Sequence, residues 1–134
     1  MIFDRIRKKF VAFTPEEWVR QHLINYLISE RGYPAMLLSV ETQLKCAGLD
    51  KRSDLLVSNR NGIPLMLAEC KAPDVVISAK VFEQISIYNQ TLNAPFLIAT
   101  NGLTHYCLRA ATDDAASVFL KEIPDFCELE AVVI

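Results

Sequence analysis

The fold of this chain is decided by residues 61–73, which read NGIPLMLAECKAP. The initial Asn-Gly pair is a strong signal for the turn of a β-hairpin. Residues 65–68 are all apolar, which is typical of a strand buried on both faces at the centre of a sheet. Because side chains alternate along a strand, Glu69 and Lys71 lie on one face. Two charges at the edge of a core cost desolvation energy, and such a conflict is expected where a protein has its functional site.

A third charged residue lies in the preceding predicted strand, residues 51–58. In an antiparallel pair, the start of one strand lies beside the end of the other. Asp54 is therefore predicted to lie near Glu69 and Lys71. Two carboxylates beside a lysine suit a hard divalent cation, which takes oxygen ligands. The alternative is an ordinary ion-pair cluster on the rim of the sheet.

Four motifs follow one another along the chain. They are Arg52-Ser53-Asp54, Asn61-Gly62-Ile63-Pro64-Leu65, Glu69-Cys70-Lys71-Ala72-Pro73 and Gln84-Ile85-Ser86-Ile87-Tyr88. This series resembles the PD-(D/E)xK, or restriction-endonuclease-like, nuclease superfamily, and within it the N-terminal nuclease domain of type I restriction enzyme R (restriction) subunits. The resemblance covers roughly residues 14–109. Ser53 stands where the superfamily name has proline, a position that varies and carries no chemistry.

The resemblance implies an α/β fold, a restriction-endonuclease-like three-layer α/β/α sandwich with a mixed central sheet of four to five strands. It implies Mg²⁺-dependent endonuclease cleavage of DNA, with Mn²⁺ as a second candidate metal. Asp54, Glu69 and the backbone carbonyl of Cys70 would hold the metal. Lys71 would position the attacking water or neutralise charge on the phosphorane, and Gln84 would orient Lys71 or the water.

Glu17 is an accessory candidate with two interpretations. Thr14, Pro15 and Glu17 form a capping box at the start of a helix, which accounts for the glutamate. In the resembled family, a glutamate on this helix often faces the metal site. The capping interpretation is preferred. Ahead of this helix, the basic residues of segment 5–9 are interpreted as a solvated arm or edge strand in preference to a phosphate-contacting arm.

Four further candidates also have simpler explanations. Glu41 belongs to an alternating strand, on its solvated face or leaning toward the metal site. Tyr88 is a neighbour of Gln84 at helical spacing and is either a core residue with a polar tip or an accessory of the site. Lys51 and Arg52 are solvated rim charges or contacts to nucleic-acid phosphates.

The remaining elements follow from periodicity and turn signals. We expect helices at Thr14–Arg31 and Ser78–Leu92, on opposite faces of the sheet, and a strand at 36–45. Val19, Leu23, Tyr26 and Leu27 are expected to form the apolar stripe of the first helix. Further strands are expected at 96–100 and 104–109, the first after a crossover from the second helix. Residues 110–134 are an uncertain extension with a short strand at 118–120, and 128–134 form another strand or a disordered end.

Composition limits the alternatives. The 134 residues predict one domain, 1–134, with 51% hydrophobic and 22% charged residues. No apolar run approaches a membrane span and no signal peptide is evident, so a cytoplasmic location is expected. Four widely spaced cysteines and two histidines argue against a structural zinc site. The net charge of −2 gives no general nucleic-acid footprint.

The resemblance names DNA as partner, with a helicase/translocase or specificity and methylation subunits of a restriction system as further partners. One alternative is a non-catalytic nucleic-acid-binding or assembly module that keeps the nuclease fold. A second is a structural interaction domain in which the acidic residues and Lys71 form only an ion-pair cluster. No Walker A, GxSxG or GxGxxG motif is present, which disfavours nucleotide hydrolysis and serine chemistry.

Overall fold

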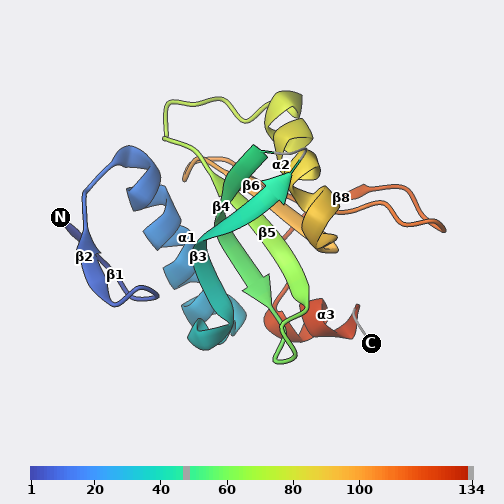
Figure 1. Ribbon diagram of the computed structural model, residues 1–134, viewed down its shortest axis with the longest axis horizontal. Coiled ribbons are helices and arrows are strands. Elements are labelled where there is room, and N and C mark those ends of the chain that lie inside the picture. The colour runs from blue at the N-terminus through green and yellow to red at the C-terminus, as the bar shows by residue number, and fades with distance from the viewer. Residues whose placement is uncertain (47–48, 133–134) are drawn as a thin grey trace.

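The central element of the fold is a six-stranded mixed sheet with the order β3-β4-β5-β6-β7-β8 (Figure 1). The computed structural model describes residues 1–46 and 49–132, with side chains described outside 41–53. The strands are β3 (Leu38–Cys46), β4 (Leu49–Ser58), β5 (Pro64–Cys70), β6 (Phe96–Thr100), β7 (His105–Arg109) and β8 (Val118–Leu120). All neighbouring pairs are antiparallel except β5 and β6, which are parallel, as the predicted crossover requires.

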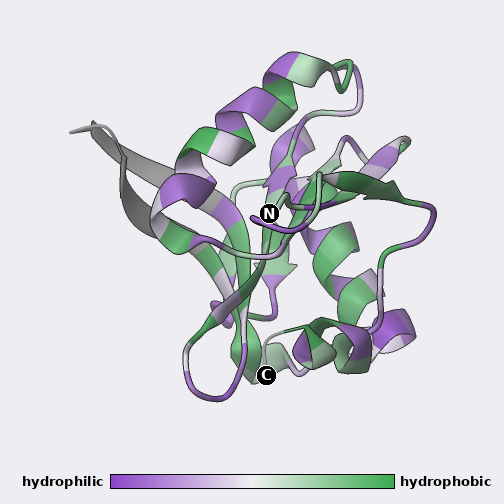
Figure 2. Cartoon of the chain, turned by 90° about the vertical axis from the view of Figure 1, so that its right-hand side faces the viewer, coloured by the Kyte–Doolittle hydropathy of each residue, from purple (hydrophilic) through white to green (hydrophobic). Residues whose placement is uncertain are grey.

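Two helices cover opposite faces of this sheet. In β4, Leu55 packs in a core cluster with α1 (Pro15–Arg31), whereas the next residue, Leu56, packs in a second cluster with α2 (Ala79–Leu92). Because successive strand residues point to opposite faces, α1 and α2 lie on opposite sides. The hydrophobic residues, green in Figure 2, concentrate along the strands between them. The predicted α/β class with a mixed sheet is confirmed.

Helix α1 begins and ends as its sequence predicts. The Thr14 hydroxyl accepts a hydrogen bond from the Glu17 backbone N–H at 3.1 Å, and Gly32 ends the helix with φ of 71°. Within the helix, Ile24 is fully buried, whereas Tyr26, which we placed in the apolar stripe, is 38% exposed. The buried face follows residues three and four apart, and this spacing selects Ile24. No helix in the described part of the chain combines the length and apolar character needed to cross a membrane.

The turn between β4 and β5 fixes the register of the central strands. The Asn59 side chain accepts hydrogen bonds from the backbone N–H groups of Asn61 and Ile63, both at 2.9 Å. Gly62 has φ of 78°, a left-handed conformation that glycine adopts at little cost. The resulting register pairs Leu55 with Ala68. The next residues along the two strands are Asp54 and Glu69.

The C-terminal part of the chain adds two elements to the fold. β8 pairs with β7 and makes the sheet six-stranded, which corrects the expected four to five strands. The expectation of a strand or a disordered end at 128–134 is wrong for the described residues, because Phe126–Ala131 form the helix α3. The Asp125 side chain caps it by accepting from the Glu128 N–H at 2.9 Å. Phe126 is buried beside Tyr33, with ring centroids 5.6 Å apart, so packing holds α3 in place.

The N-terminal segment forms a separate two-stranded hairpin of β1 (Ile2–Asp4) and β2 (Lys9–Val11). In Figure 1 this hairpin lies beside α1, on the side away from the central sheet. The expected arm is therefore an ordered hairpin. A short 3₁₀ helix, η1 (Ala35–Leu37), precedes β3, so that strand begins two residues later than expected.

Candidate active site

The candidate site lies where β4 and β5 carry charges at adjoining ends. Asp54, of β4, accepts a hydrogen bond on Oδ2 from the Cys70 backbone N–H at 2.7 Å. Glu69 lies beside it on β5, and Lys71 follows directly, with its Nζ 3.3 Å from Glu69 Oε1. Asp54, Glu69 and Lys71 are all half-buried. The structure therefore brings together the three residues that the hairpin register predicts.

The electrostatics of Glu69 are the most perturbed among these groups. Burial raises the pKa of its carboxyl group to about 7, and repulsion from Asp54 adds to this rise. Lys71 offsets part of the rise by attraction and a hydrogen bond. Two carboxylates thus lie close together in a partly desolvated space. Such perturbed groups are typical of functional sites.

Arg20 is a member of the site that our sequence interpretation missed. Its Nη2 lies 3.0 Å from Asp54 Oδ1, and its Nη1 forms an ion pair with Glu17. Burial disfavours the charge of Arg20, but the hydrogen bond and attraction of Asp54 outweigh it, so its pKa is raised. A sequence pattern could have identified it, because Glu17, Arg20 and Gln21 lie at helical spacing on the same face as buried Ile24. Polar residues on a buried helix face need partners.

The preferred capping interpretation of Glu17 accounts for its backbone only. Its N–H is capped by Thr14, but its buried carboxylate binds Arg7 and Arg20. Arg7 also pairs with Asp4, which is fully buried. A chain of ion pairs thus runs from the N-terminal hairpin through α1 to the sheet. Glu17 reaches Asp54 through Arg20.

The remaining site candidates from the sequence are exposed, pack in or against a core cluster, or have side chains that the structure does not describe. Gln84 is exposed on α2, and no hydrogen bond joins it to Lys71 within the described part of the chain. Tyr88 is half-buried and packs against the core cluster on the α2 side. The Cys70 side chain is buried, and burial raises the pKa of its thiol well above the ordinary value. The side chains of Glu41, Lys51 and Arg52 lie outside the described residues.

The donor set fits a hard divalent cation. A carboxylate offers about four lone-pair positions, so Asp54 can accept from Arg20 and Cys70 and still bind a metal. Positive charge between Asp54 and Glu69 would relieve their repulsion, and oxygen ligands are those that Mg²⁺ and Mn²⁺ favour. Within the described side chains, no group of three or more His, Cys, Asp or Glu residues is gathered around one point.

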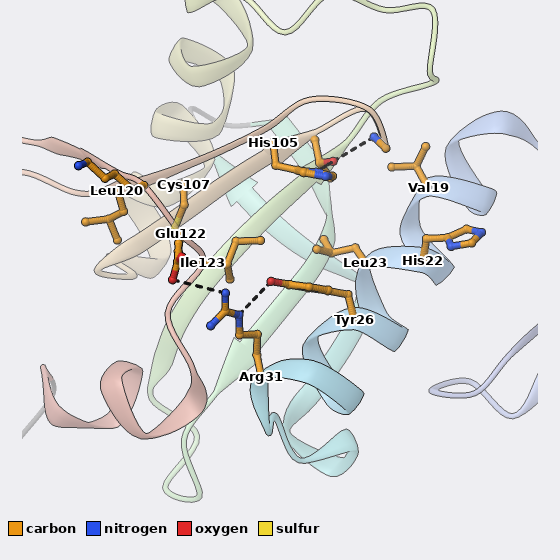
Figure 3. Close-up of a pocket in the computed structure, with 13 residues that line it drawn as sticks. Val19, His22, Leu23, Tyr26, Arg31, His105, Cys107, Leu120, Glu122 and Ile123 are labelled. Carbon is orange, nitrogen blue, oxygen red and sulfur yellow. Dashed lines mark hydrogen bonds and ion pairs between the residues drawn. The ribbon is translucent and has the colours of Figure 1, made fainter.

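A cavity of about 450 Å³ lies elsewhere, between α1, the ends of β6 and β7, and residues 120–123 (Figure 3). Several of its polar groups bind one another. Thr100 Oγ1 lies 2.6 Å from His105 Nδ1, and Arg31 Nε donates to the Tyr26 hydroxyl at 2.9 Å. Arg31 also lies 3.7 Å from Glu122. The cavity contains none of the residues of the charged site.

Comparison with known proteins gives one family and two similar folds. A family profile described as "Type I restriction enzyme R protein N terminus (HSDR_N)" matches residues 15–124. A fragment assigned to the HsdR subunit of a type I restriction enzyme from Vibrio vulnificus YJ016 aligns with a TM-score of 0.65 at 20% identity. The alignment covers 91% of this chain and 25% of that fragment, so the chain spans a quarter of the fragment's length.

A DUF820 protein from Anabaena variabilis ATCC 29413, assigned as a nuclease, aligns with a TM-score of 0.54 at 13% identity. The alignment covers 92% of this chain and 79% of that one. No curated protein matches the sequence. At these identities the two structures show a shared fold alone, whereas the family profile spans most of the chain. This chain therefore belongs to the family of type I restriction enzyme R protein N-terminal domains.

Proposed function

We propose that this chain is a metal-dependent endonuclease domain that hydrolyses DNA phosphodiester bonds. The observation that carries the proposal is the convergence of Asp54, Glu69 and Lys71 at adjoining strand ends. Two crowded carboxylates beside an amine provide a cation site and a positive charge next to it. Family membership supports the nuclease class.

Each residue has a distinct role in this proposal. Asp54 and Glu69, with the backbone carbonyl of Cys70, hold Mg²⁺, for which Mn²⁺ is the alternative. When bound, the metal supplies positive charge that offsets the phosphate charge and acidifies water. Lys71 positions the attacking water or stabilises the charge that develops on the phosphate. Gln84 is the least supported member, because it is exposed and makes no hydrogen bond with Lys71.

Arg20 and Glu17 are positioning residues in this scheme. Arg20 holds one oxygen of Asp54, while the Cys70 N–H holds the other, so the carboxylate plane is fixed from two sides. Glu17 in turn fixes the guanidinium of Arg20. Preorganised ligands of this kind favour metal binding and catalysis because no reorganisation is needed.

The proposed biological setting is a restriction system in the cytoplasm. DNA is the substrate, and a helicase/translocase or specificity and methylation subunits are the proposed partners. The family supports a restriction context. The similar fragment is four times as long as the part that this chain matches, so further activities of such proteins are proposals for this chain.

The test is nicking of supercoiled plasmid in Mg²⁺, Mn²⁺ or EDTA by wild type, Lys71→Ala and Lys80→Ala. Lys80 is an exposed lysine at the start of α2 and serves as the matched control. We expect nicking that requires metal, survives in Lys80→Ala and is lost in Lys71→Ala. Equal nicking by Lys71→Ala would reject the assignment of Lys71. A wild type that neither nicks DNA nor binds Mn²⁺ would reject the proposal.

One observation favours a second candidate, a nucleic-acid-binding or assembly module that keeps this fold without turnover. Arg20 already supplies a positive charge to Asp54. If that ion pair excludes the metal, the chain would bind DNA with a strong salt dependence and would not cleave it. Calorimetric titration with Mn²⁺ separates the candidates, because only the nuclease requires metal binding at Asp54 and Glu69.

A further inference from the structure

The positive charge of this chain is concentrated at its N-terminus. Residues 1–14 carry Arg5, Arg7, Lys8 and Lys9 against a single acidic residue, Asp4, a net charge of +3. The whole chain has a net charge of −2, so the remaining 120 residues carry −5. A local basic surface on an acidic protein can attract a polyanion to that surface.

The cations of this segment fall into two groups, one paired with buried carboxylates and one exposed to solvent. Asp4 is fully buried and accepts hydrogen bonds from the backbone N–H groups of Ile6 and Arg7, at 2.8 and 3.1 Å. The Arg7 side chain binds Asp4 and Glu17 and is thereby neutralised. Its neighbours Lys8 and Lys9 are exposed. The buried carboxylate of Asp4 thus stabilises the turn, and the positive charges of Lys8 and Lys9 on the surface are not neutralised by it.

The exposed cations have no carboxylate partner among the side chains that the structure describes. No Asp or Glu lies within 4.0 Å of Lys8 or Lys9 there. Arg5 donates to the neutral side chain of Asn25 at 3.2 Å. All three charges therefore remain available to an anionic ligand.

Lys8 occupies a strained backbone position. Its φ is 54°, in the left-handed region that glycine or asparagine adopts far more readily than lysine. The residue therefore costs folding stability at a place where it makes no ion pair with the described side chains. The hairpin turn places one residue in this region, and a lysine there, in place of glycine or asparagine, is a reason to look for a function of the side chain.

Aromatic side chains accompany the cations. Phe3 and Phe10 face each other across the hairpin, edge to face with centroids 5.2 Å apart, and are 49% and 63% exposed. Phe13, just beyond the hairpin, is 60% exposed. Exposed rings and exposed cations on one hairpin are a combination that DNA-binding surfaces use, with phosphates on the cations and sugars or bases on the rings.

The hairpin is also tied to the candidate active site. The ion pairs Arg7–Glu17, Glu17–Arg20 and Arg20–Asp54 link them without a gap. A DNA strand bound on the hairpin would therefore be held by a surface whose position relative to Asp54 is fixed.

We propose that the β1–β2 hairpin is the DNA-contacting arm of this domain. Arg5, Lys8 and Lys9 bind backbone phosphates, and the Phe3–Phe10 pair packs on sugars or bases. The choice of DNA as ligand rests on the proposed function. The docking surface itself rests on the charge, strain and exposure of the hairpin.

The first test measures binding of fluorescein-labelled duplex and single-stranded DNA by anisotropy in EDTA, over a range of salt. Lys8→Glu/Lys9→Glu is compared with Lys80→Glu/Lys121→Glu, which makes the same change in net charge at exposed lysines elsewhere. We expect the hairpin variant to bind about tenfold or more weakly, with the salt slope reduced by about two. The control variant should bind nearly as wild type does. Equal losses in both variants, or no loss in either, would overturn the proposal.

The second test uses Lys8→Gly, which relieves the strained φ. Its melting temperature should equal or exceed that of wild type, while its DNA affinity falls and its salt slope decreases by about one. Weaker binding by a protein that is no less stable excludes unfolding as the cause. Wild-type affinity in this variant would show that Lys8 contacts no phosphate.

Mn²⁺ titration of the same proteins separates this inference from the proposed function. The hairpin variants should bind Mn²⁺ as wild type does, because Asp54 and Glu69 are unchanged. If wild type does not bind Mn²⁺, the nuclease proposal is rejected. The proposal that the hairpin binds DNA is not affected by that result. A wild type that binds Mn²⁺ and no DNA would overturn the inference and leave a protein surface as the partner of the hairpin.

Discussion

Helix α1 contributes to two polar regions that differ in kind. Its first half brings Glu17 and Arg20 to Asp54, in a crowded ion-pair network with Glu69 close by. Its second half brings Tyr26 and Arg31 to a cavity of about 450 Å³. The cavity has room, but several of its polar groups bind one another, whereas the crowded region has two carboxylates that repel.

The difference shows that empty volume alone does not identify chemistry. Like charges held together in partial burial are costly, and a protein keeps them where a cation or substrate compensates the cost. The cavity has hydrogen bonds between its own side chains and one exposed ion pair, which are ordinary structural features. The first of the two regions is therefore the better candidate for function.

The largest expected effect is on metal binding. Asp54→Asn should weaken Mn²⁺ binding on the order of 100-fold, because an amide lacks the negative charge of a ligand carboxylate. The isosteric change Glu122→Gln at the cavity should alter it by less than about twofold, since Glu122 is 78% exposed and far less constrained. Calorimetric titration measures both. Similar affinities for the two variants would place the metal away from Asp54.

Stability should also distinguish the two halves of α1. Arg20→Met should lower the free energy of unfolding by about 3 kcal/mol, because it leaves Glu17 and Asp54 without their shared cation. Arg31→Met should lower it much less, since its partner Glu122 is exposed. Urea denaturation at neutral pH gives both values. Equal costs would mean that the Arg20 network contributes no more than a surface pair.

The pH dependence of stability should follow Glu69 in the metal-free protein. Its pKa rises from 4.5 in the unfolded chain to about 7 in the folded one. The folded state holds this proton more tightly, so the stabilisation is complete below pH 4.5 and is lost as pH rises through 7. We expect roughly 2 kcal/mol from this group in urea titrations.

Glu69→Gln provides the control for that titration, because it cannot lose the proton. The pH-dependent part assigned to Glu69 should disappear in this variant. Divalent metal should also reduce it in wild type, since a bound cation stabilises the ionised carboxylate. An unchanged pH profile in Glu69→Gln would show that Glu69 titrates normally.

The smallest effect should come from the cavity. Thr100→Val removes the hydroxyl that accepts from the Gly102 N–H at 3.0 Å and contacts His105. Thr100 is 1% exposed, so the cost should be about 1 kcal/mol of unfolding free energy. Plasmid nicking and Mn²⁺ affinity should not change. A loss of nicking without a loss of stability would give the cavity a part in the function.

Much of the central hairpin could be predicted because its signals are local. The Asn-Gly turn and the apolar run at 65–68 set the register, and the register brings Asp54 beside Glu69. The cap of α1 and the end of this helix at Arg31 are also set by local signals, and both are as predicted. The roles of Asp54, Glu69 and Lys71 in catalysis stay predictions.

Other features were missed for identifiable physical reasons. α3 is six residues long, too short for a clear periodic pattern, and it is held by Asp125 and by packing against Tyr33. The short strand expected at 118–120 is β8, but its pairing with β7, which adds a sixth strand to the sheet, was not predicted. Tyr26 was assigned to the core because the exact phase of the buried face cannot be read from apolar residues alone.

By itself, the sequence determined which residues could carry the chemistry and where the two long helices and the central hairpin lie. These follow from periodicity, capping and turn preferences, which act over a few neighbouring residues. Only the tertiary structure decided that Arg20 binds Asp54, 34 positions away, and that Glu17 serves this pair as well as its helix. Such contacts depend on how α1 packs on the sheet. They join residues far apart in the sequence, so no local sequence pattern predicts them.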